Sequence, residues 1–234
     1  MKTTSKLNVR RLVTIAMFCA LSYVVTLIFH FKVGFLTFDV KDAVTCVAAM
    51  LFGPGAGVSI AFLVATIESL SISDTLFWGW LMNFASTAIF SLTASLVYRR
   101  HKKMWSAVVG LGVAVFATTA GMLLLNIVVT PIYMKAPRAD VLAMIPKTLF
   151  PFNLLKSTLN ASLVMIFYKP ISTALKRAGV LADSKQGEGE YRLFSRKSLT
   201  LLLSALLLAV ACVVIMMLLM GGEFVFELLN KNVT

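Results

Sequence analysis

Long runs of apolar residues constrain the fold of this chain more than any other feature of its sequence. Several runs approach or exceed the ~20 residues that a helix needs to cross a lipid bilayer, and 59% of the 234 residues are hydrophobic. The hydrocarbon of a bilayer offers no water to backbone polar groups, so a crossing segment must bond them internally, as an α-helix does. The sequence therefore predicts an all-α polytopic membrane protein.

The positions of the basic residues predict the orientation of these helices. The chain has 22 Lys and Arg residues and a formal net charge of +12, and most of these residues lie in the stretches 2–11, 99–103 and 169–197, on alternate connections. Basic connections stay on the cytoplasmic side of a membrane. We therefore expect a multi-pass protein of the cell membrane with a cytoplasmic N-terminus. Because the charge follows the topology, we expect no nucleic-acid partner.

The apolar runs divide the chain into three parts. We expect six helices in residues 1–178, a polar cytoplasmic linker in 179–197, and an additional transmembrane helix with a short outer tail in 198–234. The expected helices cover residues 9–29, 43–52, 58–70, 77–98, 105–129, 149–171 and 199–220.

Glycine and proline residues predict where these helices end. The Gly/Pro cluster at 53–57 predicts a turn. A phosphate-binding loop needs Gly-Lys-Ser/Thr after such glycines, and none follows here, so any energy from ATP must come through another polypeptide. Pro131 predicts the outer end of the fifth helix, and we expect residues 134–148 to form an outer loop.

The start of the sixth apolar run carries an amide and a charge. Asn153 and Lys156 are three positions apart and share one face of a helix, while Pro151 suits the first helical turn. A lysine within a membrane span costs about 3 kcal/mol, so it should face a cavity or a partner. The alternative is a lysine whose ammonium extends to the membrane interface.

Further polar and aromatic side chains are expected at the same outer end of the bundle. A few placed polar groups among apolar walls are typical of a small-molecule site, and amides suit the edge of a heterocyclic ring. The alternatives are that Asp39 and Asp42 cap a helix and that Asn83 bonds a neighbouring helix. We expect residues 30–42 to form a lid. The additional candidates are Asp39, Asn83, Asn126, Tyr133 and Glu68, with Phe35, Phe38, Phe150 and Phe152 around them.

The common motifs of catalytic and metal sites do not occur. The sequence has no HExxH, GxSxG or CxxC pattern, and it has only two histidines. Cys19, Cys46 and Cys212 are scattered in apolar runs, so we expect small buried side chains, with neither a disulfide nor a metal. We therefore expect a binding protein without a cofactor, and not an enzyme.

Three segments together resemble a known family. They are Phe35-Leu36-Thr37-Phe38-Asp39 before a short helix, Leu125-Asn126 followed by Pro131-Ile132-Tyr133, and Phe150-Pro151-Phe152-Asn153-Leu154-Leu155-Lys156. Over residues 8–178 they resemble the riboflavin-binding substrate-specificity (S) component of energy-coupling factor (ECF) vitamin transporters. The resemblance implies a six-helix S-component bundle and the uptake of riboflavin or a related flavin. It also implies a transmembrane coupling (T) subunit and two cytoplasmic ATPases as partners.

The resemblance further implies roles for individual residues. Asn126, Asn153 and Lys156 would hydrogen-bond the isoalloxazine ring. The segment that contains Phe35, Leu36, Phe38 and Asp39 would close over the vitamin. Small residues on the first helix would contact the coupling subunit; here they are Ala16 and Ala20.

Several features depart from the family pattern and keep alternatives open. This chain has Asp39-Val40-Lys41-Asp42 where the family usually has Asp-Phe-Ser-Asp, and its third helix lacks the usual Glu and Lys before Glu68. One alternative is an S component for a different vitamin. Another is a non-transporting scaffold subunit that retains the fold, suggested by the seventh helix and by Glu223 and Glu227 in the tail. A membrane enzyme for lipid-like substrates is disfavoured by the missing catalytic groups.

Overall fold

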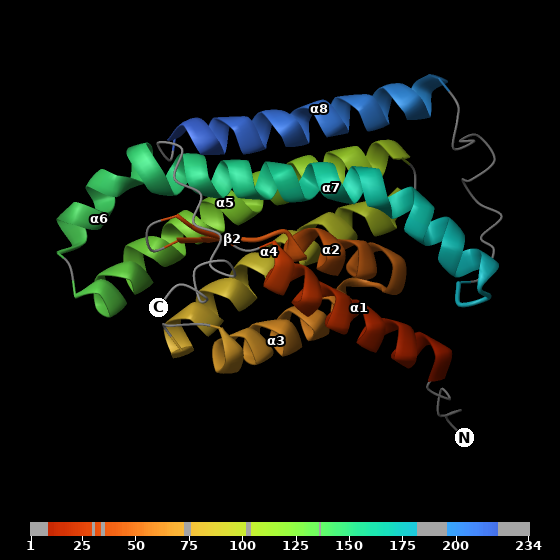
Figure 1. Cartoon of the computed structure of the whole chain (residues 1–234), viewed down its shortest axis with the longest axis horizontal. Coiled ribbons are helices and arrows are strands. Elements are labelled where there is room, and N and C mark those ends of the chain that lie inside the picture. Colours follow the sequence, from red (N-terminus) through yellow and green to blue (C-terminus); the bar gives the residue numbers. More distant parts are fainter. Residues whose placement is uncertain are drawn as a thin grey trace, which may run out of the picture.

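The computed structural model describes residues 9–29, 31–33, 36–72, 76–101, 104–135, 137–181 and 196–219. In these residues, long helices lie side by side, and one short β-hairpin joins the first two of them (Figure 1). The elements are α1 (Val9–Ile28), β1 (Phe31–Val33), β2 (Leu36–Phe38), α2 (Lys41–Phe52), α3 (Pro54–Ser71), α4 (Leu76–His101), α5 (Met104–Met134), α6 (Arg138–Met144), a π-helical turn η1 (Ile145–Leu149), α7 (Phe150–Arg177) and α8 (Arg196–Leu219).

The described helices confirm an all-α multi-pass membrane protein. Helices α1, α3, α4 and α5 and the segment 138–177 are each long and apolar enough to cross a bilayer. The 12-residue α2 is shorter, and all of its residues except Val44 and Leu51 are buried. It packs against α1, α3, α4 and α7, so it lies inside the bundle. Charged residues on α2 therefore need partners from these neighbours.

The turn expected at residues 53–57 is tighter in the structure, and α3 already begins at Pro54. Gly53 alone reverses the chain, with a φ of +106° that a side chain would disfavour. Pro54 follows at the first helical position, where its missing N–H has no cost. Gly57 lies inside α3, where a Cβ would come within 2.5 Å of the Ala49 side chain. The glycines therefore serve close packing of α3 on α2 as well as the turn.

Two other sequence expectations are wrong. Helix α5 does not end at Pro131 but continues to Met134; the proline removes one backbone hydrogen bond close to a helix end, where the loss is small. Residues 138–148, expected in a loop, lie in α6 and η1, which lead directly into α7. The wide π-helical turn contains a proline, whose ring would clash with the carbonyl four residues earlier in a regular α-helix.

The lid expected over residues 30–42 contains two paired strands that the sequence analysis did not predict. Strands β1 and β2 are antiparallel, with Phe31 opposite Phe38 and Val33 opposite Leu36. Strand β2 leads through Asp39 and Val40 directly into α2. The short connection fixes where the first residues of α2 enter the bundle.

Helix α8, the additional helix, runs alongside α7 in the opposite direction (Figure 1). Its small residues Ala205, Ala209 and Cys212 are buried, and large ones such as Leu203 and Leu207 are exposed. All three cysteines are buried and free, as predicted. The expected division at residues 179–197 stays a prediction, because residues 182–195 lie outside the described part of the chain.

Candidate functional site

Lys156 faces the interior of the bundle, and it does not extend to the membrane interface. Helix α7 begins with Phe150 and Pro151, so Lys156 lies in its second turn, 7% exposed. Its Nζ lies 2.8 Å from Oδ2 of Asp39 and donates to the carbonyl of Thr37 at 3.2 Å. Both acceptors belong to β2 or to the residue that follows it. The lysine therefore ties the hairpin to α7.

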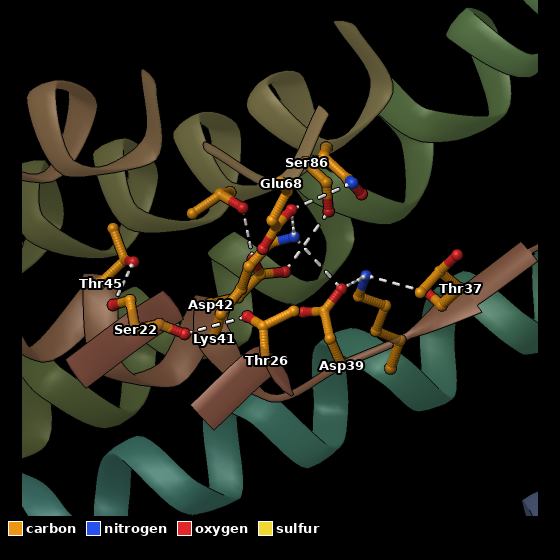
Figure 2. Close-up of polar contacts among 12 residues, drawn as sticks. Ser22, Thr26, Thr37, Asp39, Lys41, Asp42, Thr45, Glu68 and Ser86 are labelled. Atoms are coloured by element: carbon orange, nitrogen blue, oxygen red, sulfur yellow. Dashed lines mark hydrogen bonds and ion pairs between the residues drawn. The ribbon is translucent and has the colours of Figure 1, made fainter. Parts of the chain in front are cut away.

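A second buried ion pair continues from Asp39 into the bundle (Figure 2). Nζ of Lys41 lies 3.4 Å from Oδ2 of Asp39 and 2.6 Å from Oε2 of Glu68, and all three side chains are at most 2% exposed. The Asn83 side chain on α4 donates to the same Glu68 oxygen at 3.2 Å. A continuous chain of polar contacts thus runs from α7 through Asp39 and α2 to α3 and α4. Such buried charges are costly unless they are paired.

One alternative predicted that Asp39 and Asp42 cap a helix. In the structure, neither side chain caps α2. The residue at the cap position is Val40, which makes no side-chain cap bond. Asp42 instead accepts hydrogen bonds from Thr87 at 2.6 Å and from Ser86 at 3.4 Å, both on α4. These contacts tie the first turn of α2 to α4.

Asn160 on α7 supplies the missing cap, and sequence reasoning missed it. Its Oδ1 accepts from the backbone N–H of Ala43 at 2.9 Å, and its Nδ2 donates to the Asp39 carbonyl at 3.2 Å. The available signal was its spacing, because it lies four positions after Lys156 and so on the same helix face. Asn160 holds the backbone around Asp39 in place.

A cavity of about 100 Å³ lies beside Lys156. Most of the candidate site residues line this cavity, and they come from β2, α4, α5 and α7. Its lining residues are Leu36, Thr37, Trp78, Gly79, Met82, Asn83, Ser86, Met122, Asn126, Tyr133, Phe152, Asn153 and Lys156.

The remaining candidates lie behind the cavity or away from it. Phe38 is 2% exposed and packs edge-to-face on Phe152, with 6.2 Å between the ring centroids. Asp39 and Glu68 reach the wall only through the side chains they bind. Phe150 is 45% exposed and does not line the cavity. Phe35 lies outside the described residues.

The amides in the wall have fixed orientations. Nδ2 of Asn153 donates to the Leu149 carbonyl and Nδ2 of Asn126 to the Met122 carbonyl, each at 2.7 Å. A carbonyl only accepts, so the oxygens must point the other way. Oδ1 of Asn126 accepts from Thr130. Oδ1 of Asn153 is left as an acceptor for a molecule in the cavity.

Helix α4 contributes cavity residues that the sequence analysis did not name. Trp78, Met82 and Ser86 recur every four positions and line the cavity together with Asn83. The regular spacing of these residues was a signal of one shared helix face. Asn83 bonds a neighbouring helix, as one alternative predicted, and it also lines the cavity. Its contact with a ligand stays a prediction.

A larger cavity of about 620 Å³ lies between α1, α2, α7 and α8. Its lining side chains are all apolar, so it has no group that would orient a polar ligand. Among the described residues, no three His, Cys, Asp or Glu side chains are grouped to hold a metal ion. The smaller, polar cavity is therefore the candidate site.

Ala16 and Ala20 line neither cavity and lie on the exposed face of α1. Thr14, Phe18 and Ser22 are buried on the opposite face of the same helix. The exposed small residues leave a shallow strip on which another helix can pack closely.

Comparisons with known proteins agree with this architecture. Residues 10–168 match the family described as "ECF transporter, substrate-specific component". The riboflavin transporter RibU of Staphylococcus aureus (strain TCH60) is 31% identical over 185 residues, which cover 74% of this chain and 97% of that protein. A solved structure, described as "Structure and mechanism of the S component of a bacterial ECF transporter", matches with a TM-score of 0.61 and 30% identity, over 71% of this chain and 98% of that one. The family match ends within α7, before α8 begins.

Proposed function

This chain belongs to the substrate-specific components of the ECF transporters, and we propose that it binds riboflavin, or a closely related flavin, at the outer face of the membrane. One observation carries the proposal: Lys156, Asn153, Asn126 and Asn83 converge on a single cavity next to the hairpin. The 31% identical relative described as a riboflavin transporter supports the choice of ligand.

The chemistry of the cavity wall matches the polar edge of a flavin. The isoalloxazine ring carries carbonyl oxygens on both sides of a ring N–H. The Lys156 ammonium is a donor for a carbonyl, and Oδ1 of Asn153 is an acceptor for the N–H. Trp78, Tyr133 and Phe152 supply aromatic surface for the faces of the ring. The aromatic side chains thus contact the faces of the ring, and the polar groups bond its edge.

Binding a flavin requires the wall to move. The cavity of about 100 Å³ is smaller than the ~300–1,000 Å³ of typical ligand pockets. Leu36 and Thr37 are the wall residues on the short hairpin, whereas the others lie on long packed helices. Displacement of β2 breaks the bond from Lys156 to Thr37 and leaves the ammonium for the ligand. We infer that the hairpin is the movable wall.

Import requires partners, because the sequence has no phosphate-binding loop for ATP. The chain acts with a transmembrane coupling subunit and two cytoplasmic ATPases, and the exposed strip of Ala16 and Ala20 is the proposed contact with the coupling subunit. Arg11 donates to the Phe52 carbonyl, and Arg99 lies beside Gly53, so basic residues gather at the end of α2 away from the hairpin. That gathering supports a cytoplasmic N-terminus and an outward-facing cavity.

Titration of the detergent-purified full chain with riboflavin tests the proposed ligand. We expect the flavin fluorescence to be quenched on binding, with saturation at one flavin per chain. Thiamine and biotin serve as matched ligands for the alternative of a different vitamin. Saturation by one of these, with no response to riboflavin, would contradict the flavin assignment. No small-molecule binding, together with a stable protein partner other than a coupling subunit, would favour the scaffold alternative.

A further inference from the structure

The hairpin that forms the movable wall shares an apolar cluster with the additional helix. A small apolar cluster joins β2 and Val40, which precedes α2, to α7 and α8, with Phe38 and Cys212 only 2% and 4% exposed. This cluster is distinct from the main core, which lies between α1, α2, α3, α4, α5 and α7. Its members are Phe38, Phe152, Leu159, Ala209 and Cys212, with Leu36, Val40, Leu155, Leu163 and Val213 packed against them.

The same strand serves the cavity and this cluster. Leu36 lines the cavity and also packs against the cluster. The backbone carbonyl of Thr37, the next residue, accepts the hydrogen bond from Lys156. Phe38 is buried against Phe152, itself a cavity residue. An outward movement of β2 therefore has to separate Phe38 from its apolar neighbours as well as break the polar contacts of Lys156.

Helix α8 contributes only a few side chains to this cluster. Cys212 and Ala209 are buried, and Val213 is partly buried. The large apolar cavity begins immediately beside them, since Val40, Ala209 and Val213 line it too. Removal of a single side chain from α8 should therefore have a measurable effect on the strand.

We propose that α8 is a positioning element for the binding site, in which Ala209, Cys212 and Val213 complete the apolar cluster that holds strand β2 against α7 and so slow the opening of the cavity. Helix α8 lies beyond the part of the chain that matches the family, so the device is an addition to the shared six-helix bundle. The proposal rests on the proposed function in one respect only: the molecule whose release is slowed is taken to be a flavin.

The rate of riboflavin release from the full chain measures this effect. Val213→Ala and Cys212→Ala each remove part of the α8 contact, and we expect flavin to dissociate about three- to tenfold faster from them, as expected for the loss of one or two buried groups. Leu207→Ala is the matched control, since Leu207 lies on the same helix but is 75% exposed. Its release rate should equal that of the native chain. Val213→Ile, which keeps the contact, should release flavin at the native rate.

Hydrogen exchange of the backbone amides of residues 36–40 is a second readout that needs no ligand. Val213→Ala and Cys212→Ala should accelerate this exchange, whereas Leu207→Ala should not. If the native chain binds riboflavin and the variants change neither release nor exchange, the role of α8 is wrong and the flavin proposal stands. If exchange accelerates in Val213→Ala and Cys212→Ala, but neither they nor the native chain bind riboflavin, the role of α8 stands and the flavin proposal is wrong.

Discussion

The ammonium of Lys156 lies 2.8 Å from the carboxylate of Asp39, which precedes it by 117 positions in the chain. This ion pair joins the second turn of α7 to the residue that follows the hairpin, with side-chain exposures of 8% and 0%. The lysine is also part of the cavity wall, so it has a structural partner and a proposed ligand at the same place. Substitutions at the two positions can separate these roles.

Neutralising Lys156 alone should destabilise the fold, because Asp39 would keep its buried charge with one fewer cation. Lys156→Met should lower the stability by about 3 kcal/mol, which corresponds to a fall of roughly 6–12 °C in the thermal midpoint in detergent. The double variant Lys156→Met/Asp39→Asn removes both charges and should recover most of this loss. Equal midpoints for the single and the double variant would show that the ion pair has no structural role.

Asn153 is predicted to contact the ligand directly through its Oδ1. Asn153→Ala should weaken riboflavin binding about 10- to 100-fold, because a buried ligand N–H would lose its acceptor. Thr158 on the same helix is the control, since its hydroxyl donates to the Leu154 carbonyl and it does not line the cavity. Fluorescence titration of Thr158→Ala should give the native dissociation constant. Similar losses in the two variants would point to a general effect on α7.

Gly57 lets α3 approach α2 and α4 closely. A Cβ there would lie 2.5 Å from the Ala49 side chain and 3.1 Å from the Ser91 hydroxyl, so Gly57→Ala should cost about 1–3 kcal/mol. A Cβ at Gly112 on α5 would meet no neighbouring group within 4 Å, and Gly112→Ala should leave the thermal midpoint unchanged or raise it slightly. A lower midpoint for Gly112→Ala than for Gly57→Ala would contradict this packing.

The exposed strip on α1 is predicted to bind the coupling subunit. Ala16→Leu/Ala20→Leu should abolish co-purification with that subunit, because the larger side chains keep the partner helix at a distance. Riboflavin binding by the isolated chain should not change, since neither residue lines the cavity. Val113→Leu, at a 45% exposed position on α5, is the control and should co-purify normally. Normal assembly of the double variant would place the contact elsewhere.

The membrane helices and the cavity face of α7 could be predicted from the sequence. Apolar runs of the right length specify spans whatever their neighbours are, and the bounds of α1 match the prediction almost to the residue. The spacing of Asn153 and Lys156 is a property of one helix, so their shared face needed no tertiary information. The three segments that resemble the ECF family then indicated which distant residues meet them.

The remaining features depend on packing between elements. The pairs formed by Lys41 with Glu68 and by Asp42 with Thr87 join three different helices, and no local pattern specifies them. The strands around Thr37 are three residues long, too short for a periodic signal. Pro131 is a strong helix breaker on average, but its cost is small near a helix end. Cys212 shares an apolar cluster with Phe38 because α8 packs beside α7. Helix α8 lies outside the part of the chain that matches the family.

Equilibrium binding of riboflavin to the native chain and to Lys156→Met/Asp39→Asn tests the central claim most directly. The double variant keeps a neutral, folded site but lacks the ammonium that Lys156 offers the ligand. We expect saturable binding by the native chain and a dissociation constant at least about 30-fold higher for the variant. Equal affinity of two equally stable proteins would show that the flavin binds elsewhere and would contradict the account.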